Sequence, residues 1–164
     1  MSIGVCAYNE QENIRFLLQN LLYEQRIPFN FEILVVCSGC TDETPRIVEE
    51  FALKDSRVKP IIERERRGKA SAVNKIFRAY KGSYLFFIPA DALPEKGSLA
   101  KILRHFRDPR VGVAGGKPVL INQAKRVLGV EAVAHLMWRI HNLTMQVLNH
   151  DNVLTHASGE MFCI

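Results

Sequence analysis

The feature that most constrains the fold is a regular alternation of short apolar runs with amphipathic helical stripes. Residues 3–6, 31–36, 58–62 and 84–88 are runs typical of buried strands. Between them, apolar residues recur every three or four positions, as in 14–22, which predicts helices. A helix after each strand implies right-handed crossovers, so we expect an α/β fold with a mostly parallel sheet and helices on both faces.

Local signals suggest where some of these elements begin and end. Asn9 and Glu12 have the spacing of a capping box for the first helix. The apolar positions in 99–106 predict the last helix of the alternating part. We also expect strands at 111–114 and 118–121, on either side of a turn at the two glycines 115–116.

The pattern changes after this point. Residues 123–149 predict one long amphipathic helix, for which packing on the sheet or on other parts of the protein is favoured over lying in a membrane interface. Residues 155–164 resemble the start of another strand. A length of 164 residues predicts a single domain over 1–164.

Composition narrows the class of protein. The hydrophobic content is 48% and the charged content 24%, and no apolar run reaches the roughly 20 residues that span a bilayer. With no signal-peptide pattern and only four cysteines, we expect a cytoplasmic protein in a reducing compartment. The net charge of +5 favours anionic partners, among them phosphates, nucleic acid or the acidic inner face of a membrane.

Cys37 and Cys40 form a C-x-x-C pair where a predicted strand meets a predicted helix. A thiolate at a helix N-terminus is stabilised by the helix dipole, so a dithiol redox centre is one hypothesis. No other redox feature accompanies the pair, and Cys6 and Cys163 do not supply the second C-x-x-C of a zinc site.

Ligands of open parallel sheets bind beyond the carboxyl ends of the strands. Neither G-x-G-x-x-G nor a P-loop motif occurs there, which leaves the usual dinucleotide and P-loop modes unsupported. A different nucleotide mode stays open: Tyr8 can flank a base, Arg66, Arg67 and Lys69 can neutralise a diphosphate, and Asp91 can hold a divalent cation. Each also has a plain alternative as packing, solvated charge or a turn residue.

Four segments in this order and spacing carry a family resemblance: SIGVCAYNEQENI, VVCSGCTDET, RRGKASAVNKI and YLFFIPADALPEKGSL. Together they resemble the nucleotide-binding half of the GT-A fold (Rossmann-like) glycosyltransferases of family 2. The resemblance covers nearly the whole chain, and its specificity lies in the combination of the segments. It implies transfer of a sugar, of the hexosyl type, from a nucleoside-diphosphate donor to an acceptor hydroxyl with inversion.

The resemblance also implies roles for individual residues. Asp91 would bind Mg²⁺ or Mn²⁺ and act in catalysis, and Glu160 is the nearest candidate for the catalytic base. The residues expected to bind the nucleotide sugar are Ala7, Tyr8, Glu10, Ser38, Asp42, Arg67, Gly68, Lys69, Asn74 and Ala90.

This chain departs from the family pattern at two positions. Ser38 stands where many relatives have the aspartate that contacts the base, and Pro89 stands where they have the first aspartate of the D-x-D motif. The family's base lies downstream of the strand that resembles ASGEMFCI. We therefore expect a donor-binding module that lacks its C-terminal acceptor part, and the acceptor, whether glycan, lipid or small molecule, is left open.

A second hypothesis is a degenerate GT-A domain that binds a nucleotide or a partner without turnover. Pro89 and the absence of a clear base favour it. Nucleic-acid binding is disfavoured because the cationic residues have no interleaved aromatic stacking positions. Peripheral association with a membrane stays open.

Overall fold

The computed structural model describes residues 1–117, 119, 130–150 and 161–164. They belong to two compact units, Met1–Gly116 with Gly159–Ile164, and Lys117–Ser158. The first unit contains the sheet and is described first.

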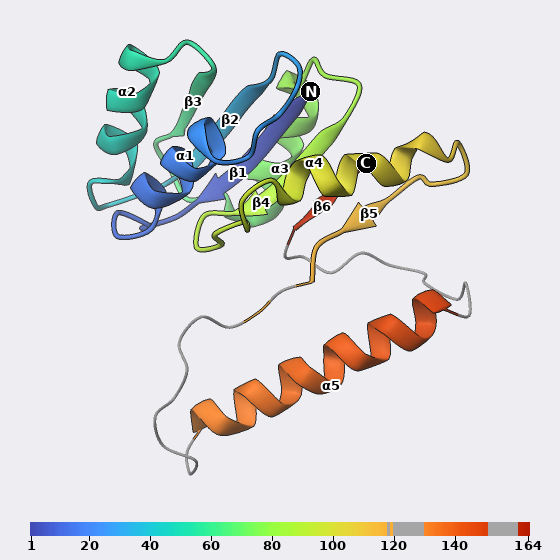
Figure 1. Cartoon of the computed structure of the whole chain (residues 1–164). Helices are drawn as coiled ribbons and strands as arrows, with labels where there is room; N and C mark the ends of the chain where they lie inside the picture. The colour runs from blue at the N-terminus through green and yellow to red at the C-terminus, as the bar shows by residue number, and fades with distance from the viewer. Residues whose placement is uncertain (118, 120–129, 151–160) are drawn as a thin grey trace. The chain divides into compact units, whose positions relative to one another are not determined.

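Within the described residues, the sheet has six strands in the order β3-β2-β1-β4-β6-β5 (Figure 1). Its four N-terminal strands are parallel, and β6 and β5 add an antiparallel edge. This arrangement confirms the predicted mostly parallel sheet. The bounds are β1 Ser2–Ala7, β2 Glu32–Ser38, β3 Val58–Glu63, β4 Leu85–Pro89, β5 Ala114–Gly115 and β6 Phe162–Cys163.

Helices cover both faces of this sheet. Side chains of α1, α2 and α4 join one hydrophobic cluster on the first face, which we call the α1 face. Side chains of α3 join a second cluster on the opposite face, the α3 face. The bounds are α1 Ile14–Tyr23, α2 Thr44–Lys54, α3 Gly68–Ala79 and α4 Ser98–Leu103, followed by a 3-10 turn at Arg104–Arg107.

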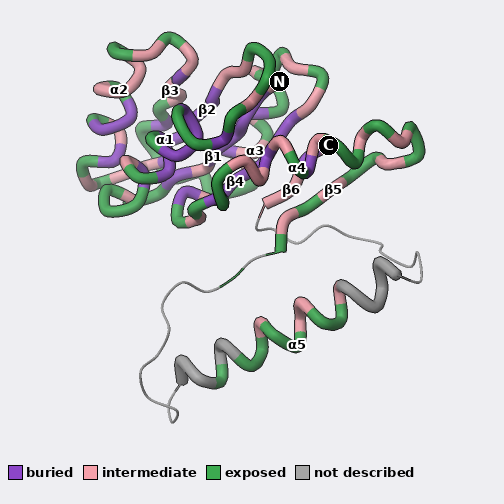
Figure 2. The backbone as a smooth tube through the Cα atoms, in the orientation of Figure 1, coloured by how far each residue is buried: buried purple, intermediate pink, exposed green. Residues whose placement is uncertain are grey.

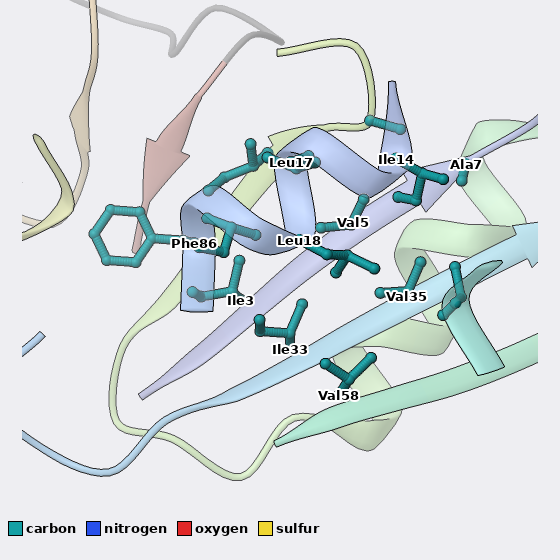
Figure 3. Close-up of a cluster of buried hydrophobic side chains, with 14 of the residues drawn as sticks. Ile3, Val5, Ala7, Ile14, Leu17, Leu18, Ile33, Val35, Val58 and Phe86 are labelled. Atoms are coloured by element: carbon teal, nitrogen blue, oxygen red, sulfur yellow. The ribbon is translucent and has the colours of Figure 1, made fainter. Parts of the chain in front are cut away.

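The largest core lies on the α1 face, because successive side chains of a strand point to opposite faces. Ile3 and Val5 of β1 pack with Leu17 and Leu18 of α1 and with Phe86 of β4, and all five are fully or almost fully buried (Figure 3). Burying each such side chain stabilises the fold by about 1.5–3 kcal/mol. Figure 2 shows the buried residues concentrated in the strands and the helix faces turned toward them.

The predicted capping box is wrong. Helix α1 begins at Ile14 after Asn13, without a side-chain hydrogen bond at its cap. Asn9 instead has a left-handed backbone (φ 54°), a conformation that asparagine adopts more readily than most residues. Its side chain is engaged elsewhere, since Oδ1 accepts a hydrogen bond of 2.9 Å from the Thr41 N–H.

The strands predicted on either side of glycines 115–116 are confirmed only in part. Among the described residues of 111–121, Ala114–Gly115 forms a strand, and it pairs with β6. Gly116 continues this contact by donating a 3.0 Å hydrogen bond to the Met161 carbonyl. Positions 118, 120 and 121 of the predicted second strand lie outside the described residues. The predicted C-terminal strand is confirmed at Phe162–Cys163, and 155–160 lie outside the described residues.

The described part of the second unit consists mainly of α5 (Val130–His150). It confirms a long helix over the described part of the predicted range, whereas 123–129 lie outside the described residues. Among the residues that the structure describes, no helix combines the length and the apolar character needed to cross a membrane.

Candidate functional site

A cavity of about 410 Å³ opens on the α3 face near the carboxyl ends of β1, β2 and β4. We call it the α3-face cavity. Its wall includes Cys6 of β1, Ser38 of β2 and Pro89 of β4, with Lys69 and Val73 of α3 opposite the sheet. This is the edge at which ligands of open α/β sheets bind.

Most residues expected at a nucleotide-sugar site meet in this cavity. Asp42, Arg67 and Asn74 do not line it, and Asn74 is exposed on α3. Glu160 lies outside the described residues. The expected residues that line the α3-face cavity are Ala7, Tyr8, Glu10, Ser38, Gly68, Lys69, Ala90 and Asp91.

The loop after β1 is held in place by the loop after β2. The Asn9 amide donates a 3.1 Å hydrogen bond to the Thr41 hydroxyl. The Glu10 N–H donates one of 2.8 Å to the Thr44 hydroxyl. These contacts fix the backbone on either side of Tyr8 and Glu10, so both residues enter the cavity wall from a constrained loop.

Asp42 completes this link between the two loops. Its carboxylate accepts hydrogen bonds of 3.1 Å from the Gln11 N–H and 3.0 Å from the Thr44 N–H. Although burial opposes the charged form, the Thr44 hydroxyl together with these N–H groups holds the pKa of Asp42 below its usual value. Asp42 therefore links the loop after β1 to the start of α2.

Tyr8 and Arg66 form a flat, charged surface at the cavity wall. The guanidinium carbon of Arg66 lies 3.9 Å from the centroid of the Tyr8 ring, which is a cation–π contact. Both residues line the cavity and both are exposed. A planar, anionic ligand can stack on the ring and pair with the guanidinium.

A glycine allows the loops after β2 and β3 to approach each other. Gly39 has φ +63°, and a Cβ at this position would lie 2.3 Å from the Arg66 nitrogen. A side chain at this position would collide with Arg66, the residue that stacks on Tyr8. In the CSGC stretch, the glycine is therefore the residue that the contact between the two loops requires.

Ser38 lines the cavity at the end of β2, and the buried Glu63 lies next to it at the end of β3. They are register partners at the ends of β2 and β3. The Ser38 hydroxyl oxygen accepts a 3.2 Å hydrogen bond from the Arg67 N–H. Arg67 is therefore connected to the cavity wall through its backbone. The pairing of Ser38 with Glu63 was not expected, because it depends on the strand register, which the sequence does not specify.

The start of α3 brings positive charge to the cavity. Gly68 and Lys69 are its first residues, and both line the wall. The first N–H groups of a helix have no intrahelical partners and favour anions. On the sheet side, Gly4 permits the close approach of α3, because a Cβ there would lie 2.6 Å from Ile76 Cγ2.

The opposite side of the cavity is aromatic. The rings of Phe87 and Phe162 are stacked with centroids 5.1 Å apart, and Phe77 lies 5.3 Å from Phe87. All three line the cavity. The cavity therefore has a polar, charged side and an apolar side.

The cysteine pair does not have the properties of a redox centre. Burial raises the pKa of Cys37 to about 12 and also raises the pKa of Cys40. Both cysteines are free thiols. Because the thiolate is the reactive form, these environments disfavour a dithiol function.

Asp91 is an exposed carboxylate in the turn after β4, at the cavity wall. The described residues contain no cluster of three or more His, Cys, Asp or Glu side chains that could hold a metal. Mg²⁺ is commonly bound through one or two carboxylates, waters and substrate phosphates. A single carboxylate at the wall of this cavity fits a cation of this kind better than one that needs an all-protein cage.

Comparison with known structures supports the fold. The mannosyltransferase PcManGT from Pyrobaculum calidifontis, solved with GDP-Man and Mn²⁺, is 34% identical and has a TM-score of 0.63, covering 68% of this chain and 33% of that chain. S. aureus TarS 1-349 in complex with UDP-GlcNAc is 24% identical with a TM-score of 0.60, covering 74% and 36% of the two chains. Both agree with the expected GT-A, Rossmann-like architecture.

Sequence comparison agrees. Glycosyltransferase AglD of Haloferax volcanii is 27% identical over 82% of this chain, although this match covers only 23% of the relative. This chain thus spans about a quarter of that relative's length. The glycosyl transferase family 2 profile matches residues 2–162. This chain therefore belongs to glycosyl transferase family 2.

Proposed function

We propose that this chain is the donor-binding part of an inverting glycosyltransferase that moves a hexosyl group from a nucleoside-diphosphate sugar to an acceptor hydroxyl. The observation that carries the proposal is the α3-face cavity, which combines an aromatic ring, cations and a carboxylate at the ligand-binding edge of a family 2 chain. PcManGT was solved with a nucleotide sugar, GDP-Man, and with Mn²⁺.

Each side of the cavity suits one part of such a donor. Tyr8 and Arg66 offer a stacking surface for the nucleoside. Lys69 and the first N–H groups of α3 would bind the diphosphate and neutralise the charge that grows on it as the glycosidic bond breaks. Asn74 and Asp42 would not contact the donor from the cavity wall. Asn74 would support the site through helix α3, and Asp42 through the two loops that it links.

Asp91 would hold Mg²⁺ or Mn²⁺ together with the donor phosphates. The bound cation would supply charge stabilisation to the leaving diphosphate. Pro89 cannot replace the first carboxylate of a D-x-D motif, so we assign the protein's part in holding the cation to Asp91.

The acceptor hydroxyl must lose its proton as it attacks the anomeric carbon, which calls for a carboxylate base within hydrogen-bond reach. Glu160 is our candidate within this chain. The acceptor, which can be a glycan, a lipid or a small molecule, and the cytoplasmic location stay predictions.

Nucleotide binding tests the proposal directly. Isothermal titration of the full chain with GDP, UDP, ADP and CDP should give saturable binding to at least one of them in Mg²⁺ or Mn²⁺. EDTA or the Asp91→Asn change should weaken that binding by about tenfold or more. A matched control is Glu95→Gln, an exposed carboxylate four residues further on, which should leave affinity unchanged. If none of the four diphosphates binds with either cation, the proposal is wrong.

A degenerate domain that binds nucleotide without turnover is the second candidate, and Pro89 at the cavity wall favours it. The two differ in their products. Transfer or donor hydrolysis by the full-length protein that disappears in Asp91→Asn supports the enzyme, whereas metal-dependent binding without product supports the degenerate domain.

A further inference from the structure

Helix α3, which brings Lys69 to the wall of the α3-face cavity, begins without a capping side chain of its own. Its N-cap residue is Arg67, whose side chain makes no capping hydrogen bond within the described part of the chain. The next residue, Gly68, has a positive φ of +80°. Serine, threonine, aspartate or asparagine usually caps a helix with its own side chain. The start of α3 is instead held by contacts from other elements.

These contacts come from Ser38 and Glu63, the last register pair of β2 and β3. The Ser38 hydroxyl oxygen accepts the 3.2 Å hydrogen bond from the Arg67 N–H. Glu63 Oε1 accepts a 3.0 Å hydrogen bond from the Ser71 hydroxyl and lies 3.5 Å from the Lys75 ammonium. One strand end thus holds the residue before α3, and the other holds the helix itself.

Glu63 is a buried carboxylate that its surroundings keep ionised. Its side chain is only 3% exposed. The Ser38 hydroxyl is the main cause that holds the pKa of Glu63 below its usual value, and it prevails with Ser71 and Lys75 over the opposing effect of burial. Because an ionised carboxylate only accepts hydrogen bonds, it draws the hydrogens of both hydroxyls toward itself. The lone pairs of the Ser38 oxygen are then available to the Arg67 N–H.

The charges of Glu63 and Lys69 both reach the same part of the cavity wall. Burial raises the pKa of the Cys6 thiol to about 11, while Lys69 opposes this rise and Glu63 adds to it. Cys6 and Lys69 line the cavity, and Glu63 is not among the lining residues. Glu63 therefore lies close to the site without facing it, so its effect on a ligand is exerted through the groups that it holds.

We propose that Glu63 is a positioning residue, which holds the start of α3 so that Lys69 and the first N–H groups of the helix face the donor diphosphate. This inference rests on the function proposed above. The strength of hydrogen bonds to phosphate oxygens depends steeply on distance and angle, so a small shift of the helix weakens all of them. The effect should not depend on the base, because the positioned groups would contact the phosphates.

Isothermal titration in Mn²⁺ with the two nucleoside diphosphates that the wild type binds best tests this role. Glu63→Gln keeps the size of the side chain but loses the charge and one acceptor oxygen. It should weaken the binding of both nucleotides by the same factor, about fivefold. The matched control is Glu65→Gln, an exposed neighbour in the same segment, which should leave both affinities unchanged.

A double-mutant cycle with Lys69→Met separates positioning from a general loss of packing. If Glu63 acts through the start of α3, its replacement costs less affinity once Lys69 is absent. The loss in the double variant should then be smaller than the product of the two single losses. Independent structural damage would instead make the two losses multiply.

Each alternative result has a defined meaning. Unchanged affinity in Glu63→Gln, unequal losses for the two nucleotides, or losses that multiply in the double variant overturn the positioning role and leave the proposed function intact. If Glu63→Gln does not fold, Ser71→Ala takes its place in the cycle, because Ser71 binds the same carboxylate and does not line the cavity. It is held to the same criteria, with an expected loss of about threefold. Failure of every nucleoside diphosphate to bind the wild type overturns the proposed function, and this inference with it.

Discussion

The two faces of the parallel strands are built from alternating residues of the same segments, yet they differ in composition. On the α1 face, β1 presents Ile3 and Val5, which are fully buried against α1. On the α3 face the same strand presents Gly4 and Cys6, both of which line the α3-face cavity. Because successive side chains of a strand point to opposite faces, the same strand forms part of the packed core on one face and part of the cavity wall on the other.

The difference indicates how this fold separates stability from binding. Residues of the α1 face are large, apolar and closely packed, so their replacement should change stability first. On the α3 face, residues toward the carboxyl ends of β1 and β2 such as Cys6 and Ser38 are small or polar and leave room for a ligand, so their replacement should change affinity first. Four predictions test this separation, in order of expected effect.

The largest effect should come from Phe86→Ala on the α1 face. Phe86 is fully buried in the large core, and truncating such a side chain removes transfer free energy and leaves a cavity, at a cost of about 3–5 kcal/mol. Urea unfolding followed by circular dichroism should show a lower midpoint with an unchanged slope. Under native conditions the dissociation constant for the preferred nucleoside diphosphate should stay within about twofold of wild type. A large loss of affinity with little loss of stability would contradict the separation.

The next effect concerns Gly39→Ala, where stability and binding should change together. The new Cβ would lie 2.3 Å from the Arg66 backbone nitrogen, and φ is +63°. We expect a loss of about 1–3 kcal/mol and weaker nucleotide binding, because Arg66 must move away from Tyr8.

Gly97→Ala is a matched control for that change. Gly97 also has a positive φ, +72°, but no atom lies within 4 Å of its added Cβ. It should show the backbone strain alone, about 1 kcal/mol, with unchanged affinity. Equal effects of the two substitutions on nucleotide binding would rule out the collision with Arg66 as the cause.

Sequence periodicity predicted most of this architecture for a physical reason. The apolar alternation in segments such as 31–36 and 84–88 is set by burial between two layers of helices, and burial is visible in the sequence. The polar residues after these strands could also be placed at one edge, because parallel strands end together. Tyr8, Ser38 and Asp91 indeed line one cavity.

Contacts between segments could not be predicted in the same way. The pairing of Ser38 with Glu63 depends on strand register, and the contact of Arg66 with Tyr8 depends on two loop conformations. The capping-box prediction failed for a similar reason, since Asn9 binds Thr41 of another loop instead of the helix that follows it. Long-range partners compete with local ones, and a local motif does not reveal which partner prevails.

A smaller effect is expected from Phe77→Ala, the counterpart of Phe86→Ala on the α3 face. Phe77 is 44% exposed and contacts the Phe87 ring at 5.3 Å. Truncating Phe77 buries no new polar group and removes only its ring contact with Phe87. We therefore expect the free energy of unfolding to fall by about 1 kcal/mol. The same urea experiment measures it. A loss as large as that of Phe86→Ala would show that the two faces contribute equally to stability.

The smallest effect should be a dependence of stability on pH that comes from Glu63. Because the pKa of Glu63 is held below its usual value in the folded state, by Ser38 first and then by Ser71 and Lys75, its charge stabilises the fold above the pKa of the unfolded chain. That contribution disappears as the pH falls through the lowered, folded-state pKa.

The free energy of unfolding of the wild type should therefore fall more than that of Glu63→Gln when urea titrations at pH 7 and pH 3 are compared. Glu65→Gln, whose side chain is exposed, should follow the wild type. If Glu63→Gln is destabilised equally at both pH values, then the loss comes from packing and not from the charge. In that case the α3 face would resemble the α1 face more closely than its composition suggests, and Glu63 would be a structural residue at the edge of the site.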